Sequence, residues 1–159
     1  MADKSDKELR QDMWKAMSSS PYVMLGLDGD RRQFEAMYAV LDKDADSEFW
    51  FYTRKDNRAA GGGPATVTFV NKGHTLFASI EGTLVEETSE AIKDKYWSNH
   101  VEAWYDQGRQ DPSLLMLRFD LSDAEIWETD QTLIGKLKMF TGQTIKGDDQ
   151  SGSHAKTGV

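Results

Sequence analysis

Hydrophobic residues near the start of the chain recur with the period of a helix and then become continuous. Residues 4–18 have apolar positions at helical spacing between charged ones, which predicts an amphipathic helix. These positions are Leu9, Met13, Ala16 and Met17. The SSSP stretch ends this pattern, and YVMLGL at residues 22–27 is typical of a short buried strand.

Further along, apolar and β-forming residues occur in short runs separated by polar or glycine-containing turns. The predicted strands cover residues 34–41, 48–53, 65–71 and 75–87. Gly82 lies inside the last of these runs, which indicates a β-bulge or a close approach of two backbones. The spacing of the strands is that of antiparallel hairpins.

The second half of the chain is predicted to contain one helix and two more strands. The helix covers residues 89–105, and the strands are LLMLRFD at 114–120 and AEIWETD at 124–130. Residues 131–140 fit either a short helix or an edge strand. We expect a single domain over residues 1–142, followed by a flexible tail at 143–159 that is rich in glycine and polar residues. Antiparallel strands with inserted helices predict an antiparallel barrel or an α+β domain.

Composition excludes several classes of function. The chain of 159 residues has a formal net charge of −8, which argues against a general nucleic-acid binder. It has no cysteine, so disulfides, thiol nucleophiles and thiolate metal sites are excluded. The histidines, His74, His100 and His154, have no second ligand at metal-binding spacing, and no metal is expected. No signal peptide or membrane span is evident, so the cytoplasm is the expected compartment.

The segment FWFYTRKDNR, residues 49–58, combines a dense aromatic run with a sudden group of hydrogen-bond donors. A loop containing threonine, arginine, lysine and asparagine can present hydroxyl, guanidinium and amide donors to one phosphate group. A charged turn that only ends a strand is the alternative interpretation. The residues alone leave both interpretations open.

Four motifs in the same order give the chain a family resemblance. They are YVMLGL, EFWFYTRKDNR, IEGTLVEE before a tryptophan-containing helix, and DPSLLMLRFDLSDAEIWE. With these motifs the chain resembles the general stress protein branch of the pyridoxamine 5'-phosphate oxidase-like, FMN-binding split-barrel family. The similarity runs from the N-terminal helix to about Phe140. It implies a mainly β fold with flanking helices, a split β-barrel of antiparallel, Greek-key-like topology.

The resemblance also implies a homodimer with FMN in two clefts at the dimer interface. The family's phosphate-binding loop falls on Thr53, Arg54, Asn57 and Arg58. A late-strand tryptophan near the flavin ring corresponds to Trp127. Contacts from the second strand correspond to Glu35, Ala36 and Met37.

Two positions depart from the family pattern. Glu35 and Ala59 stand where basic residues are expected, which should weaken FMN binding. No Arg-x-His pair is present, so oxidation of pyridoxamine phosphate is not expected. Three functions stay open. The first is a flavin-dependent oxidoreductase or electron-transfer protein. The second is a non-catalytic protein that binds FMN, or a deazaflavin or haem in its place, and the third is a degenerate barrel that acts as an interaction module. The redox or small-molecule partner is not indicated.

Overall fold

The first element is a capped helix. The computed structural model describes residues 4–30, 34–129 and 152–158. In α1 (Asp6–Ser19), the Ser5 hydroxyl accepts the backbone N–H of Glu8, and the Glu8 carboxylate accepts that of Ser5 at 2.8 Å. This reciprocal capping box satisfies two N–H groups that a helix leaves without partners. The helix ends before Pro21, because a proline disfavours helical backbone at the residue preceding it.

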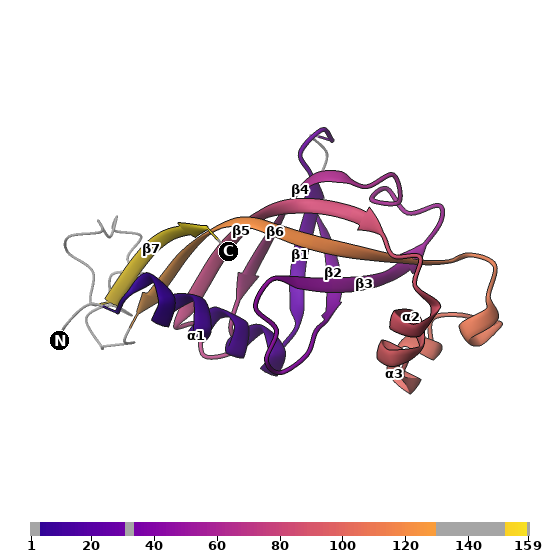
Figure 1. Cartoon of the computed structure of the whole chain (residues 1–159), viewed down its shortest axis with the longest axis horizontal. Coiled ribbons are helices and arrows are strands. Elements are labelled where there is room, and N and C mark those ends of the chain that lie inside the picture. The colour runs from indigo at the N-terminus through magenta and orange to yellow at the C-terminus, as the bar shows by residue number, and fades with distance from the viewer. Residues whose placement is uncertain (1–3, 31–33, 130–151, 159) are drawn as a thin grey trace.

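Among the described residues, seven antiparallel strands form one sheet, and six of them close into a barrel (Figure 1). The order is β3-β2-β1-β4-β5-β6-β7, and β3 also pairs with β6. Strands β1 to β4 thus have Greek-key order. The prediction of an antiparallel, Greek-key-like split barrel is confirmed. The strands are β1 (Tyr22–Leu27), β2 (Glu35–Val40), β3 (Glu48–Arg54), β4 (Gly63–Val70), β5 (Leu76–Glu86), β6 (Leu114–Thr129) and β7 (Gly152–Gly158).

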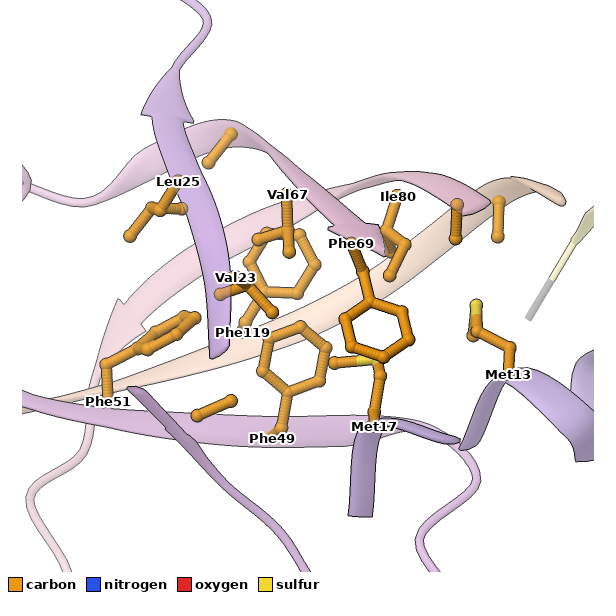
Figure 2. Packing of buried hydrophobic residues seen from close by; sticks show 14 of the residues in the cluster. Met13, Met17, Val23, Leu25, Phe49, Phe51, Val67, Phe69, Ile80 and Phe119 are labelled. Carbon is orange, nitrogen blue, oxygen red and sulfur yellow. The ribbon is translucent and has the colours of Figure 1, made fainter. Parts of the chain in front are cut away.

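The barrel interior is filled by aromatic and aliphatic side chains from every second position of each strand. Phe49 lies at the centre of this cluster. Its ring stacks on that of Phe119, with the centroids 4.9 Å apart, and meets the Phe51 ring edge-on, with the centroids 5.5 Å apart. Figure 2 shows Met13 and Met17 projecting from α1 into the same cluster. The amphipathic helix therefore covers barrel side chains that would otherwise meet water, which is the main stabilisation available to it.

Strand β3 is aromatic on both faces because both faces are covered. Phe49 and Phe51 point into the barrel, whereas Trp50 and Tyr52 alternate to the outside. There Trp50 packs on Tyr96 of α2 (Glu90–Tyr96) at 4.8 Å. Tyr52 donates a hydrogen bond of 2.6 Å to the carbonyl oxygen of Lys93. The aromatic run thus holds the helical segment against the barrel wall.

The prediction of one helix over residues 89–105 is wrong in two respects: the helix is interrupted, and α-helical structure in this range ends at Glu102. Trp97 has extended backbone, and a short helix α3 (Asn99–Glu102) starts after it. The Ser98 hydroxyl accepts the backbone N–H of Val101, so this serine acts as an N-cap in place of a helix-interior residue. The break lets Trp97 turn toward Tyr52, with the ring centroids 5.6 Å apart.

The two strands predicted at 114–120 and 124–130 are instead one continuous strand, β6. Its pairing with β5 shifts by one residue at Gly82, which lies opposite Leu121 while Glu81 lies opposite Asp123. Ser122 is the extra residue, and its hydroxyl donates to the Glu81 carbonyl. The polar Ser-Asp pair is therefore a β-bulge within a strand rather than a turn. The irregularity predicted at Gly82 is confirmed.

The predicted flexible tail is partly a strand. Residues Gly152–Gly158 form β7, which pairs with residues 123–129 of β6 beyond the part of β6 that β3 occupies. Composition does not reveal such a pairing, because backbone groups rather than side chains make the ladder. Residues 131–140 and 143–151 lie outside the described residues.

Neither a membrane-spanning helix nor a metal-binding cluster of side chains occurs among the described residues. No helix among them is long and apolar enough to cross a membrane. Within the same ranges, no cluster of three or more histidine and acidic side chains is arranged to hold a metal ion.

Gly82→Ala should destabilise the barrel. A Cβ atom at this position would lie 2.4 Å from the carbonyl oxygen of Asp120 and 2.8 Å from the Phe119 ring. We expect a loss of about 1–3 kcal/mol in the free energy of unfolding, measured by urea denaturation. Gly61→Ala is the control, because a Cβ there meets nothing within 4 Å. Equal stability of the two variants would contradict the close approach at the bulge.

Candidate functional site

The split in the barrel arises between β2 and β3. These strands are in register only at Ala39 with Phe51 and at Val40 with Trp50. Beyond these pairs, β3 continues along β6, and β2 continues along β1 as far as Glu35. Because the two strands diverge, a cavity of about 830 Å³ opens between them. This volume is within the range of about 300–1,000 Å³ that is usual for small-molecule sites.

The diverging edge of β2 presents backbone groups to this cavity. The Ala39 N–H donates to the Pro21 carbonyl at 2.8 Å, toward the β1 side of the strand. Since backbone groups alternate in direction along a strand, those of Ala36 and Tyr38 face the edge that β3 has left. Both residues line the cavity. A bound molecule can therefore meet peptide donors and acceptors there.

The 55–58 loop forms the opposite wall, and Asn57 organises it. Its backbone N–H donates to the Arg54 carbonyl at 3.0 Å, and its side-chain oxygen accepts the Ala59 N–H at 2.8 Å. Ala59 itself is 4% exposed and packs in the core cluster. The side chain at this position thus belongs to the core, although the family pattern expects a basic residue there.

Glu35 lies directly across from this loop and bonds to it. Its Oε1 accepts a hydrogen bond of 2.8 Å from the Asn57 amide, and its Oε2 lies 3.5 Å from Nε of Arg58. The side chains of Glu35 and Arg58 are 31% and 42% exposed, so water reaches the pair. Two of the donors predicted to hold a phosphate are therefore engaged by a carboxylate of the same chain.

Arg54 occupies a different position, at the end of β3. Its guanidinium donates to the Ser113 hydroxyl at 3.0 Å and to the Trp104 carbonyl at 2.9 Å, and lies 5.5 Å from the Tyr105 ring centroid. These oxygen acceptors are neutral. The arginine links the strand to the segment after α3 and brings its positive charge to the cavity wall.

Thr53 is the buried member of the predicted loop, at 8% exposure. Its carbonyl accepts a hydrogen bond of 2.7 Å from the Tyr105 hydroxyl. Burial raises the pKa of Tyr105 to about 12, so this phenol remains a neutral donor at physiological pH. The contact fixes the backbone at the point where β3 enters the loop.

Exposed aromatic side chains surround the cavity. Tyr22 and Tyr38 are cross-strand neighbours with ring centroids 5.1 Å apart, and His100 lies 4.7 Å from Tyr38. Trp104 is 69% exposed. Such rings offer flat apolar surfaces to a planar ligand.

The structure brings together most of the residues that the sequence singled out. Seven of them line the cavity: Glu35, Ala36, Met37, Thr53, Arg54, Asn57 and Arg58. Trp127 does not; it lies on β6, opposite Phe77 of β5 in register.

Several lining residues were not expected from the sequence, namely Tyr22, Tyr38, His100, Trp104 and Tyr105. The interruption at Ser98 carries His100, Trp104 and Tyr105 into the cavity. Ser98, an N-cap residue type three positions before Val101, is a local sign of that interruption in the sequence.

Comparisons with known proteins agree with this architecture. The model of the pyridoxamine 5'-phosphate oxidase-like family matches residues 8–149. A general stress FMN/FAD binding protein from Xanthomonas citri is 42% identical, with 80% of this chain and 93% of that chain covered and a TM-score of 0.74.

Two further solved structures are similar. A general stress family protein from Xanthomonas campestris pv. campestris is 42% identical over 84% of this chain and 94% of its own, with a TM-score of 0.74. A general stress protein 26 from Jannaschia sp. CCS1 is 26% identical over 98% of this chain and 100% of its own, with a TM-score of 0.78. No curated protein matches the chain.

Tyr105→Phe tests the hydrogen bond to Thr53. The substitution leaves a buried carbonyl without this donor, so the free energy of unfolding at pH 7 should fall by about 1–2 kcal/mol. Tyr22→Phe, at a residue that is 61% exposed, should change it by less than about 0.5 kcal/mol.

The difference in the free energy of unfolding between wild type and Tyr105→Phe should also depend on pH. A tyrosine whose pKa is raised in the folded state contributes stability that is complete below the unfolded pKa and is lost as pH rises through the folded pKa. The difference should therefore narrow between about pH 10 and pH 12. Denaturation series at pH 7, 10 and 11.5 would measure it, and a constant difference would contradict the raised pKa.

Proposed function

The chain belongs to the pyridoxamine 5'-phosphate oxidase-like family, and on that premise we propose that it binds flavin mononucleotide in the cavity between β2 and β3. The observation that carries the proposal is the donor loop at residues 53–58 beside that cavity. The Xanthomonas citri relative, named an FMN/FAD binding protein, supports a flavin as the ligand. The general stress names of the relatives support a stress-related role.

The residues present fit a phosphate-bearing aromatic ligand. The Glu35 carboxylate stands in for an anion, because its two oxygens already sit against the Asn57 amide and the Arg58 guanidinium. On the proposal, Arg54 adds a second guanidinium, and the flavin ring lies against the aromatic side of the cavity. The backbone groups of Ala36 and Tyr38 hydrogen-bond its polar edge.

FMN would supply hydride or electron transfer, and we propose that the protein is a flavin-dependent oxidoreductase or electron-transfer protein. The chain's own part is to bind and orient the flavin and to exclude water from one side of the ring. His100 of α3 lies beside Tyr38 and lines the cavity, and on the proposal it contacts a second substrate there. A non-catalytic flavin carrier is distinguished by slow or absent reduction of the bound flavin by nicotinamide nucleotides.

We also propose that two copies form a dimer through the outer face of β1 and β2. Tyr22 and Met24 of β1 are 61% and 40% exposed. Phe34, directly before β2, and Tyr38 of β2 are 41% and 37% exposed. Exposed apolar patches of this kind mark interaction sites. Tyr22 and Tyr38 also line the cavity, so a second copy on this face would cover its open side.

Flavin binding can be tested with a charge-matched pair of variants. Purified protein mixed with excess FMN and desalted should retain the flavin absorbance at about one flavin per chain. Arg58→Ala should weaken FMN binding about tenfold through loss of a charge-assisted contact. Lys55→Ala removes the same charge from the same loop at an exposed residue that does not line the cavity, and should change affinity by less than about threefold.

Colourless protein that retains neither FMN nor riboflavin would overturn the proposed function. Equal losses in Arg58→Ala and Lys55→Ala would show that only the general charge of the loop matters. Reduction of the bound flavin by NADH or NADPH, followed by the loss of its absorbance, tests the oxidoreductase proposal separately.

The proposed dimer predicts a solution mass of twice the 18.0 kDa of the chain in light scattering. Met24→Glu should convert the dimer to monomer, because two like charges would face each other across a symmetric interface. Val85→Glu, at a comparably exposed apolar residue on β5, should leave the mass unchanged. A wild-type monomer at micromolar concentration would contradict the dimer.

A further inference from the structure

The position of Glu35 relative to the donor loop has a consequence for ligand choice. The Glu35 carboxylate of β2 reaches the 55–58 loop, with one oxygen 2.8 Å from the Asn57 amide nitrogen and the other 3.5 Å from Nε of Arg58. Amide and guanidinium groups at this spacing are also the donors that a phosphate group uses. Glu35 and a phosphate therefore require the same two donors.

Charge among the lining residues supports the same view. Arg54 and Arg58 contribute two positive charges, and Glu35 and Asp56 contribute two negative ones. The two acids differ in geometry: Glu35 is bonded to the loop, whereas Asp56 is an exposed residue of the loop itself. If these acids weaken phosphate binding only by repelling its charge, both should do so. If a carboxylate weakens it by occupying the loop donors, only Glu35 should do so.

We propose that Glu35 is a specificity-determining residue that occupies the phosphate position of the loop, so that a ligand's phosphate gains affinity only by displacing this carboxylate from Asn57 and Arg58. The inference rests on the proposed function and deepens it. The wild-type cavity should then discriminate less between FMN and riboflavin, which differ by the phosphate alone, than a cavity without Glu35 does. Removing Glu35 should increase this discrimination.

The dissociation constants of FMN and of riboflavin, measured by quenching of flavin fluorescence, test the proposal. In Glu35→Ala, FMN should bind about tenfold more tightly than in wild type, since both donors are released, and riboflavin should change by less than about threefold. Glu35→Gln keeps the side-chain shape and removes the charge, so it should tighten FMN binding by an intermediate factor. It also serves if the alanine variant does not fold.

Asp56→Ala is the matched control, because it removes the same charge from the same cavity. It should change the ratio of the two dissociation constants by less than about threefold. If Asp56→Ala and Glu35→Ala changed this ratio equally, the proposed occupation of the loop donors by Glu35 would be wrong. General charge repulsion of the phosphate would then explain the result. A ratio that is the same in wild type and both Glu35 variants would also overturn the proposal.

A failure of the proposed function is distinguishable from a failure of this inference. If neither flavin binds any variant, the proposed function is wrong, and inorganic phosphate becomes the probe. Titrated against the thermal unfolding of the protein, phosphate should still bind Glu35→Ala about tenfold more tightly than wild type. Equal phosphate affinities would overturn the inference whether or not a flavin binds.

Discussion

The structure depends on how β3 pairs with its two neighbours in the sheet, β2 and β6. This strand must pair with β6 along its whole length to close the barrel, but it pairs with β2 over only two residue positions. A fully paired β2–β3 hairpin would close the wall at this point. Because the strands diverge instead, the barrel keeps its filled core, and a cavity of about 830 Å³ opens between β2 and β3.

The two faces of β3 link the core to the cavity. Phe49 and Phe51 fill the barrel, and Trp50 and Tyr52 hold α2 against its outer wall. The helical segment is interrupted at Ser98, and the chain then returns past the end of β3. There the Tyr105 hydroxyl donates a hydrogen bond to the Thr53 carbonyl. The same aromatic run thus stabilises the fold and places one wall of the candidate site.

Positive and negative side chains at the candidate site are equal in number, although a phosphate-binding loop alone suggests an excess of positive charge. Arg54 is held by neutral oxygens, and Arg58 is paired with Glu35. The family resemblance presents Glu35 as the loss of a cation. The geometry adds that its carboxylate is seated on donors of the loop, which changes the physical question from repulsion to competition for the same hydrogen bonds.

The sequence by itself determined the barrel strands, the N-terminal helix and the donor loop, because these depend on local periodicity and on residue chemistry. It also indicated the irregularity at Gly82. The continuous β6, the β7 pairing and the break at Ser98 were decided by tertiary structure, since each depends on backbone or packing partners distant in the chain. For the same reason, only the fold could separate Trp127 from the cavity and bring Glu35 onto the loop. Side-chain type can be read along a chain, but the partner of a side chain is set by contacts between segments far apart in sequence.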